Sequence, residues 1–268
     1  MLFVALIAFG PLVVLAIFSF NDSSILAFPL KGFTLEWYEQ ALTNETLRES
    51  LWNSVRIAVV VTPISLLLGT LAAIGITRFV FRGRALAGGF VGTPLVLPWL
   101  VIGISALLFF DWSSRNLFDF QLSLVTAGLM HIVVAFPLVT ALVSAQLVSI
   151  PPSLEEAALD LGALPREAYR LIILPLLVPT LAASAIFVFS WSFNNFIVSF
   201  FTLGFESTFP VWVFSSLRRS RNLPVVNSIS TLVSVVQVGI VWGAWFVLKR
   251  QSERRGQDFG KVIAGGGG

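Results

Sequence analysis

The sequence predicts an all-α integral membrane protein with six transmembrane helices. Only 12% of its 268 residues are charged and 56% are apolar, whereas an ordinary soluble domain carries about a quarter of charged residues. The mean hydropathy is +0.90. Apolar runs long enough to cross about 30 Å of hydrocarbon recur along the chain. Because no alternating barrel pattern is present, these runs are expected to be helices.

The charge pattern excludes several other classes of protein. The net charge is +3 and the sequence contains no cysteine, which rules out disulfides, thiolate metal sites and cysteine catalysis. The basic residues lie in short loops between apolar runs. This distribution is typical of membrane orientation rather than of a nucleic-acid-binding face. We therefore expect contact with membrane lipid and none with nucleic acid.

Six runs meet the length requirement for a transmembrane helix: Met1–Phe20, Ser54–Thr77, Ala85–Phe110, Leu122–Ile150, Leu174–Phe201 and Ile229–Leu248. The first run lacks a basic leading region and a small-residue cleavage pattern, so it is interpreted as a retained helix. Five of the six runs contain proline, which kinks a helix and frees a carbonyl. Such kinks indicate either a cavity between the helices or simple packing adjustments.

The distribution of lysine and arginine predicts the orientation of the chain. With six spans, ten basic residues share one side with the N-terminus and seven lie on the other. The more basic side is expected to be cytoplasmic. This places both termini inside and makes residues 1–250 the transmembrane domain. Residues 251–268 form a cytoplasmic tail that ends in a linker-like glycine run.

Two of the predicted loops on the opposite side contain helical patterns of their own. Thr34 begins a short amphipathic segment that Thr43-Asn44 breaks, and Thr46 to Glu49 has the form of a capping box leading into the second span. Further along, Val211–Leu217 is apolar but too short to span a membrane. We expect it to be a helix that lies against the bundle.

A polar island of residues 151–173 interrupts the apolar sequence. Pro151-Pro152 end the fourth span, Ser153 can cap a new helix, and Glu155 and Glu156 fall in its first turn. Ala157 and Ala158 keep one surface small enough to enter a groove. Gly162 is expected to end this short helix, and Pro165 to begin the next segment.

The island resembles a known family signature. Glu156-Ala157-Ala158, Gly162, Ile172 and Leu174-Pro175 are similar to the EAA signature of ABC importer permeases at every defining position. The resemblance implies a coupling helix that contacts a partner ATPase dimer. The coupling residues would be Glu155, Glu156, Ala157, Ala158, Asp160, Gly162 and Ala163.

The resemblance extends to the permeases of the spermidine/putrescine importer family. It is carried by Ser19-Phe20-Asn21, Pro29 to Thr34, Trp37-Tyr38, Asn53-Ser54 and Phe209 to Trp212. It implies a type I importer fold in the bacterial inner membrane, with a second permease subunit and an external substrate-binding protein as partners. ATP and Mg²⁺ would bind the ATPase, so this chain would be neither an enzyme nor a holder of a cofactor or metal.

The chain departs from polyamine permeases where those proteins tend to carry acidic residues. The fifth span has Asn194 and Asn195, and the third has Trp99 after its proline pair. Carboxylates would match a cationic solute, whereas amides only form hydrogen bonds and an indole offers a cation–π face. Together with Trp191 and His131, these are the candidate substrate-path residues. An amino-acid-like, opine-like or anionic solute therefore remains an alternative to a polyamine.

Two alternatives of another class are also open. The six helices could form a channel that needs no ATPase. Alternatively, Gly103-Ile104-Ser105-Ala106 and His131 could form the dyad of an intramembrane serine hydrolase. The hydrolase alternative leaves the polar island unexplained, and co-purification of an ATPase would distinguish the channel from the importer. His131 is also interpretable as a residue that holds two helices together by hydrogen bonds.

Overall fold

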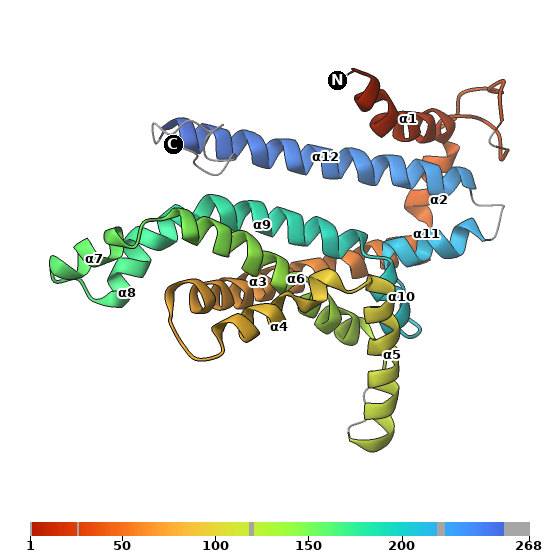
Figure 1. Cartoon of the computed structure of the whole chain (residues 1–268). Helices are drawn as coiled ribbons and strands as arrows, with labels where there is room; N and C mark the ends of the chain where they lie inside the picture. Colours follow the sequence, from red (N-terminus) through yellow and green to blue (C-terminus); the bar gives the residue numbers. More distant parts are fainter. Residues whose placement is uncertain (1, 26, 118–120, 219–222, 255–268) are drawn as a thin grey trace. The chain divides into compact units, whose positions relative to one another are not determined.

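The computed structural model describes residues 2–25, 27–117, 121–218 and 223–254 (Figure 1). Over these residues the regular structure is helical, apart from one antiparallel bridge between Asn21 and Phe33. The helices are α1 Leu2–Ser19, α2 Glu36–Thr43, α3 Glu45–Arg78, α4 Arg84–Val96, α5 Trp99–Asn116, α6 Leu124–Ser149, α7 Ser153–Asp160, α8 Pro165–Ala168, the π-helix η1 Tyr169–Ile173, α9 Leu174–Asn194, α10 Ile197–Thr202, α11 Phe209–Leu217 and α12 Leu223–Arg254. Residues 255–268, which hold most of the predicted tail and its glycine run, lie outside the described residues.

The chain divides into two compact units. The first comprises residues 1–55 and 206–244, and the second comprises residues 56–205 and 245–268. Each unit is described by itself below. Helices α3 and α12 each run through a boundary between the two units.

In the first unit, the loop between α1 and α2 is fastened at Asn21. The Oδ1 atom of Asn21 accepts the Lys31 N–H at 2.9 Å, and its carbonyl accepts the Trp37 indole N–H at 2.9 Å. The Ser19 and Tyr38 hydroxyls lie 2.7 Å apart. These are the residue pairs that carry the resemblance at the start of the chain. Of these contacts, the Ser19–Tyr38 bond joins two side chains, whereas the other two each use one backbone atom.

The start of α3 is attached to α11 within the same unit. Asn53 donates to the Ser207 carbonyl at 3.0 Å, and the Ser54 hydroxyl accepts the Phe209 N–H at 2.9 Å. The predicted helix at 211–217 is present as α11. The capping residue of α3 differs from the prediction, because Asn44 rather than Thr46 accepts the Leu47 N–H, at 3.0 Å. Asn44 stands one residue before the first residue of α3, where a cap must be, whereas Thr46 lies inside the helix.

The core of the second unit is built around α6, which packs against α4, α9 and α10. A close approach between α3 and α6 depends on Gly69, since a Cβ there would lie 2.5 Å from the Cβ of Val139. Thr126 of α6 donates to the Thr202 carbonyl of α10 at 2.7 Å. Small residues and hydroxyls are the usual means by which helices pack in a membrane.

The prediction of one continuous third span is wrong. Helices α4 and α5 are separated by Leu97 and Pro98 and are bent by 102°. Proline disfavours the helical conformation of the residue before it, and Leu97 is accordingly extended, with ψ of 138°. The break is therefore much sharper than a proline kink.

The fifth span is also interrupted, contrary to the prediction. Helix α9 ends at Asn194, and Asn195 adopts an extended backbone with ψ of 109°. The Asn195 Oδ1 atom then accepts the Val198 N–H at 3.0 Å and starts α10. Asparagine competes with helical hydrogen bonding in this way. The span thus contains a second short helix before Leu203.

The helices long and apolar enough to cross a membrane number four, or five if α4 and α5 form one broken span. These counts apply to the described part of the chain. In that part, Phe9–Ser19 of α1 is also apolar but is shorter than the 18 residues required of a spanning helix. The predicted second, fourth and sixth spans are present in α3, α6 and α12. The predicted fifth span begins earlier than expected, because α8, η1 and α9 follow one another from Pro165 to Asn194.

Candidate functional site

Helix α7 contains the centre of the polar island. It runs from Ser153 to Asp160, and Pro152 rather than Ser153 is its N-cap. The Gly162 N–H donates to the Leu159 carbonyl at 2.9 Å, and the Ala163 N–H donates to the Ala158 carbonyl at 3.0 Å. These two bonds define a Schellman motif. Gly162 has φ of +88°, which explains why glycine is the favoured residue there.

The coupling residues predicted from the sequence lie on one short segment and differ in exposure. Glu156, Ala157 and Asp160 are exposed, while Ala158 is buried. Leu161 is 89% exposed. A surface that combines carboxylates, a small side chain and an exposed leucine can bind a complementary groove on another protein.

Glu155 has a different environment from Glu156. Its Oε1 atom lies 2.9 Å from Nε of Arg78, the last residue of α3, and both side chains are mostly buried. The two atoms form an ion pair, although their alignment lies outside hydrogen-bond geometry. Arg78 also donates from Nη2 to the Ile150 carbonyl at 3.0 Å. One guanidinium thus binds the end of α6 and the start of α7.

The segment after α7 continues directly into α9. Pro165 is the first residue of α8, as predicted, and the Glu167 carboxylate accepts the Leu164 N–H at 2.8 Å. The next turn, η1, is a π-helix, which is often found at functional positions. Its first residue, Tyr169, lies close to the Glu155 carboxylate.

His131 lies at the centre of a second polar cluster, deep in the second unit. The side chain is fully buried. Its Nδ1 atom lies 2.9 Å from the Ser192 hydroxyl of α9, and its Nε2 atom lies 3.0 Å from the Ser199 hydroxyl of α10. Both ring nitrogens are therefore engaged. The proposed pairing of His131 with Ser105 in a hydrolase dyad is not present.

Aromatic side chains connect this cluster to the break between α4 and α5. The Trp191 ring lies edge-on to His131, with 5.5 Å between ring centroids, and edge-on to Trp99 at 5.9 Å. Trp99 is the first residue of α5 and is 44% exposed. The structure thus brings together three of the five candidate substrate-path residues.

The two asparagines occupy different environments. Asn195 is buried and caps α10, so its amide is committed to the backbone. Asn194 is exposed and donates to the Ser190 carbonyl at 2.9 Å. Of this pair, Asn194 is the one whose side chain reaches the surface of the second unit.

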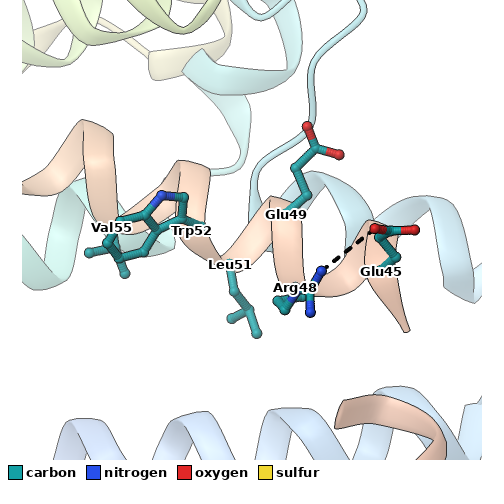
Figure 2. Close-up of a pocket in the computed structure, with 6 residues that line it drawn as sticks. All are labelled: Glu45, Arg48, Glu49, Leu51, Trp52 and Val55. Carbon is teal, nitrogen blue, oxygen red and sulfur yellow. Dashed lines mark ion pairs between the residues drawn. The ribbon is translucent and has the colours of Figure 1, made fainter. Parts of the chain in front are cut away.

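A surface hollow of about 770 Å³ lies beside the first turns of α3, within the first unit (Figure 2). It is lined by Glu45, Arg48, Glu49, Leu51, Trp52 and Val55. Glu45 and Arg48 form an exposed ion pair at 3.6 Å. None of the predicted path or coupling residues lines this hollow. Over the described residues, no group of three His, Asp or Glu side chains is placed to hold a metal ion.

Sequence reasoning missed three residues of these clusters: Arg78, Ser199 and Tyr169. Arg78 is one of the ten basic residues that predict the orientation of the chain, and a basic residue in the last turn of a helix commonly binds nearby carbonyls. Ser199 falls seven residues after Ser192, which would be two turns in an uninterrupted helix, although the structure places the two serines on α9 and α10. That spacing was the available signal for a serine pair around His131.

Comparison with known proteins places these features in context. Residues 65–249 match the family described as "Binding-protein-dependent transport system inner membrane component". The putrescine transport system permease protein PotI of Escherichia coli K12 is 30% identical over 96% of this chain and 92% of its own. The spermidine/putrescine transport system permease protein PotC of Shigella flexneri is 29% identical over 92% of each chain.

The fold is similar to that of solved transporters. Two crystal structures of a bacterial alginate ABC transporter match with TM-scores of 0.75 and 0.72, each at 16% sequence identity. The first covers 93% of this chain and 92% of its own, and the second covers 95% and 93%. The second was solved in complex with an alginate pentasaccharide-bound periplasmic protein.

Proposed function

Because the chain belongs to the family of binding-protein-dependent transport system inner membrane components, we propose that it is one of two permease subunits of an ATP-driven ABC importer. The two permeases would enclose a path that opens alternately to either side of the membrane. ATP, Mg²⁺ and the hydrolytic chemistry would belong to a partner ATPase dimer. An external binding protein would deliver the solute.

The observation that carries this proposal is the exposed face of α7. Glu156, Ala157 and Asp160 are exposed on a short helix that has its own cap and turn. A helix of eight residues gains little stability from its own hydrogen bonds, so this exposed face is suited to a partner. We assign the ATPase to this face. Displacement of the ATPase when it binds ATP would move α7 and tilt the helices that follow α7.

The proposed arrangement has six spans with both termini in the cytoplasm. In that arrangement α1 is the first span, and α4 with α5 forms a broken third span. The ten basic residues on the side of the 151–173 segment support this orientation. The location is the bacterial inner membrane, as for the family description.

The solute class that we propose is a polyamine of the putrescine or spermidine kind. The support comes from PotI and PotC, which are 30% and 29% identical to this chain over more than nine-tenths of its length. The exposed Trp99 ring offers a cation–π face to an ammonium group. Asn194 supplies an amide where a carboxylate would favour a cation more strongly, so a neutral or anionic solute is the alternative.

Co-purification from detergent tests the importer against an ATPase-independent channel. An ATP-hydrolysing subunit should follow the tagged permease at a fixed stoichiometry, and its hydrolysis should rise when the loaded binding protein is added. Solute flux through liposomes that contain this chain alone would contradict the proposal.

Ligand binding by the partner binding protein tests the solute class. Calorimetric titration should show binding of putrescine or spermidine and none of opine-like or phosphorylated compounds. Preference for an anionic or amino-acid-like ligand would overturn the polyamine assignment while leaving the importer intact.

A further inference from the structure

The orientation of α7 depends on very few contacts of its own. Among its eight residues only Ala158 is buried. A short helix with so little buried surface needs another constraint to hold one orientation. The ion pair between Arg78 and Glu155 supplies it, because Glu155 is a mostly buried, charged side chain of α7.

This ion pair differs from two exposed ion pairs elsewhere in the chain, Arg48–Glu45 and Arg115–Asp111. The side chains of Arg78 and Glu155 are 11% and 17% exposed, whereas those of Arg115 and Asp111 are 74% and 53% exposed. Exposed pairs contribute little because water and salt screen them. Loss of one partner of a mostly buried pair leaves the other charge uncompensated, which is far more disruptive.

Four elements meet at this position. Arg78 ends α3 and binds the Ile150 carbonyl at the end of α6, as well as Glu155 in the first turn of α7. Tyr169 of η1 lies close to the same carboxylate, and η1 leads directly into α9. The planar guanidinium can hold two acceptors in a fixed relative direction, which a flexible lysine does less well.

We propose that the Arg78–Glu155–Tyr169 cluster is the connection through which movement of α7 reaches α3 and α9. The inference rests on the proposed function, in which an ATPase displaces α7. Arg78 and Glu155 are positioning residues in this account, because they need not touch the ATPase or the solute. Glu156 meets the partner, while its neighbour Glu155 transmits the movement into the helices.

The test uses the complete transporter, reconstituted with its ATPase and binding protein in liposomes. The measured quantity is the ratio of putrescine imported to ATP hydrolysed, at equal amounts of assembled complex. Arg78→Gln is expected to retain ATP hydrolysis within about twofold and to lower the ratio about tenfold, within the range typical of coupling between sites. Asp111→Asn, which breaks an exposed ion pair, is the matched control and should leave the ratio unchanged.

A double variant separates a connection from a merely structural contact. Glu155→Gln combined with Arg78→Gln breaks the same contact that Arg78→Gln already breaks, so the ratio should equal that of Arg78→Gln alone. A wild-type ratio in Arg78→Gln would overturn the inference. So would a double variant whose loss equals the product of the two single losses. Failure of the ATPase to co-purify with the wild-type chain would instead count against the proposed function.

A distance measurement addresses the same cluster without the partners. The sequence contains no cysteine, so spin labels can be attached at Val80→Cys and Leu161→Cys, which are 92% and 89% exposed. One narrow distance distribution is expected with Glu155 in place, and a broad one with Glu155→Gln. Identical distributions in the two proteins would contradict the inference.

Discussion

The His131 cluster and the α7 segment use polar residues in opposite ways, the first in a buried position and the second mostly in exposed positions. His131 is fully buried, and each ring nitrogen has a serine partner, so α6, α9 and α10 are held by side-chain hydrogen bonds. Helix α7 keeps most of its polar side chains exposed and has one buried ionic contact, at Glu155. The comparison shows two kinds of polar contact. The helices are held together where His131 has a hydrogen-bond partner at each ring nitrogen, and α7 can move because it has few contacts.

The largest expected effect on stability follows removal of the His131 side chain. His131→Ala leaves the Ser192 and Ser199 hydroxyls unpaired and creates a cavity, which should cost about 2–4 kcal/mol of unfolding free energy. Thermal unfolding in detergent would show a clear drop in melting temperature. Ser105→Ala, at an exposed position of α5, is the control and should melt as the wild type does. A normal melting temperature for His131→Ala would show that this cluster does not hold the helices.

A smaller and local effect is expected at Gly162. Gly162→Val forces a β-branched residue to adopt φ of +88° and should cost about 1–2 kcal/mol. Since an added Cβ would meet nothing within 4 Å, the cost is conformational rather than steric. Gly162→Asn should therefore be much milder. Hydrogen exchange should report faster opening of α7 in the valine variant, and equal exchange in both variants would contradict this account.

The smallest of these effects concerns the cap of α10. Asn195→Ala removes the acceptor of the Val198 N–H and should cost about 1 kcal/mol. Asn195→Ser restores a capping oxygen and should recover most of the loss. The measurement is again thermal unfolding. If serine and alanine were equally destabilising, the interruption between α9 and α10 would have another cause.

Much of this architecture could be predicted from periodicity and local signals. The apolar runs that became α3, α6 and α12 were visible, as were the end of α7 at Gly162 and the start of α8 at Pro165. Helix breaks were harder to predict, because both Leu97 and Asn195 lie within apolar runs. In each case a local rule, for the residue before proline or for the asparagine side chain, competes with hydrophobicity.

Residues of a candidate site could be predicted from the sequence where they are contiguous, but not where they are distant along the chain. The coupling segment is contiguous, so its residues could be named together from the pattern alone. Arg78 and Glu155 are 77 positions apart, and their pairing depends on how α3 and α6 end. A pairing of that kind arises from tertiary packing and leaves no periodic signal. Trp99 and Trp191 were both candidates, but only the structure shows that their rings meet.

Charge reversal at Glu156 tests the central claim most directly. Glu156 is exposed, so Glu156→Lys should leave membrane insertion and folding intact, since surface changes rarely exceed about 0.5 kcal/mol. Glu39→Lys, in the equally short helix α2 and also exposed, is the matched control for co-purification of the ATPase. In the reconstituted transporter, Glu156→Lys should abolish uptake and the stimulation of ATP hydrolysis by loaded binding protein. Normal stimulated hydrolysis in that variant would contradict the assignment of α7 to the ATPase.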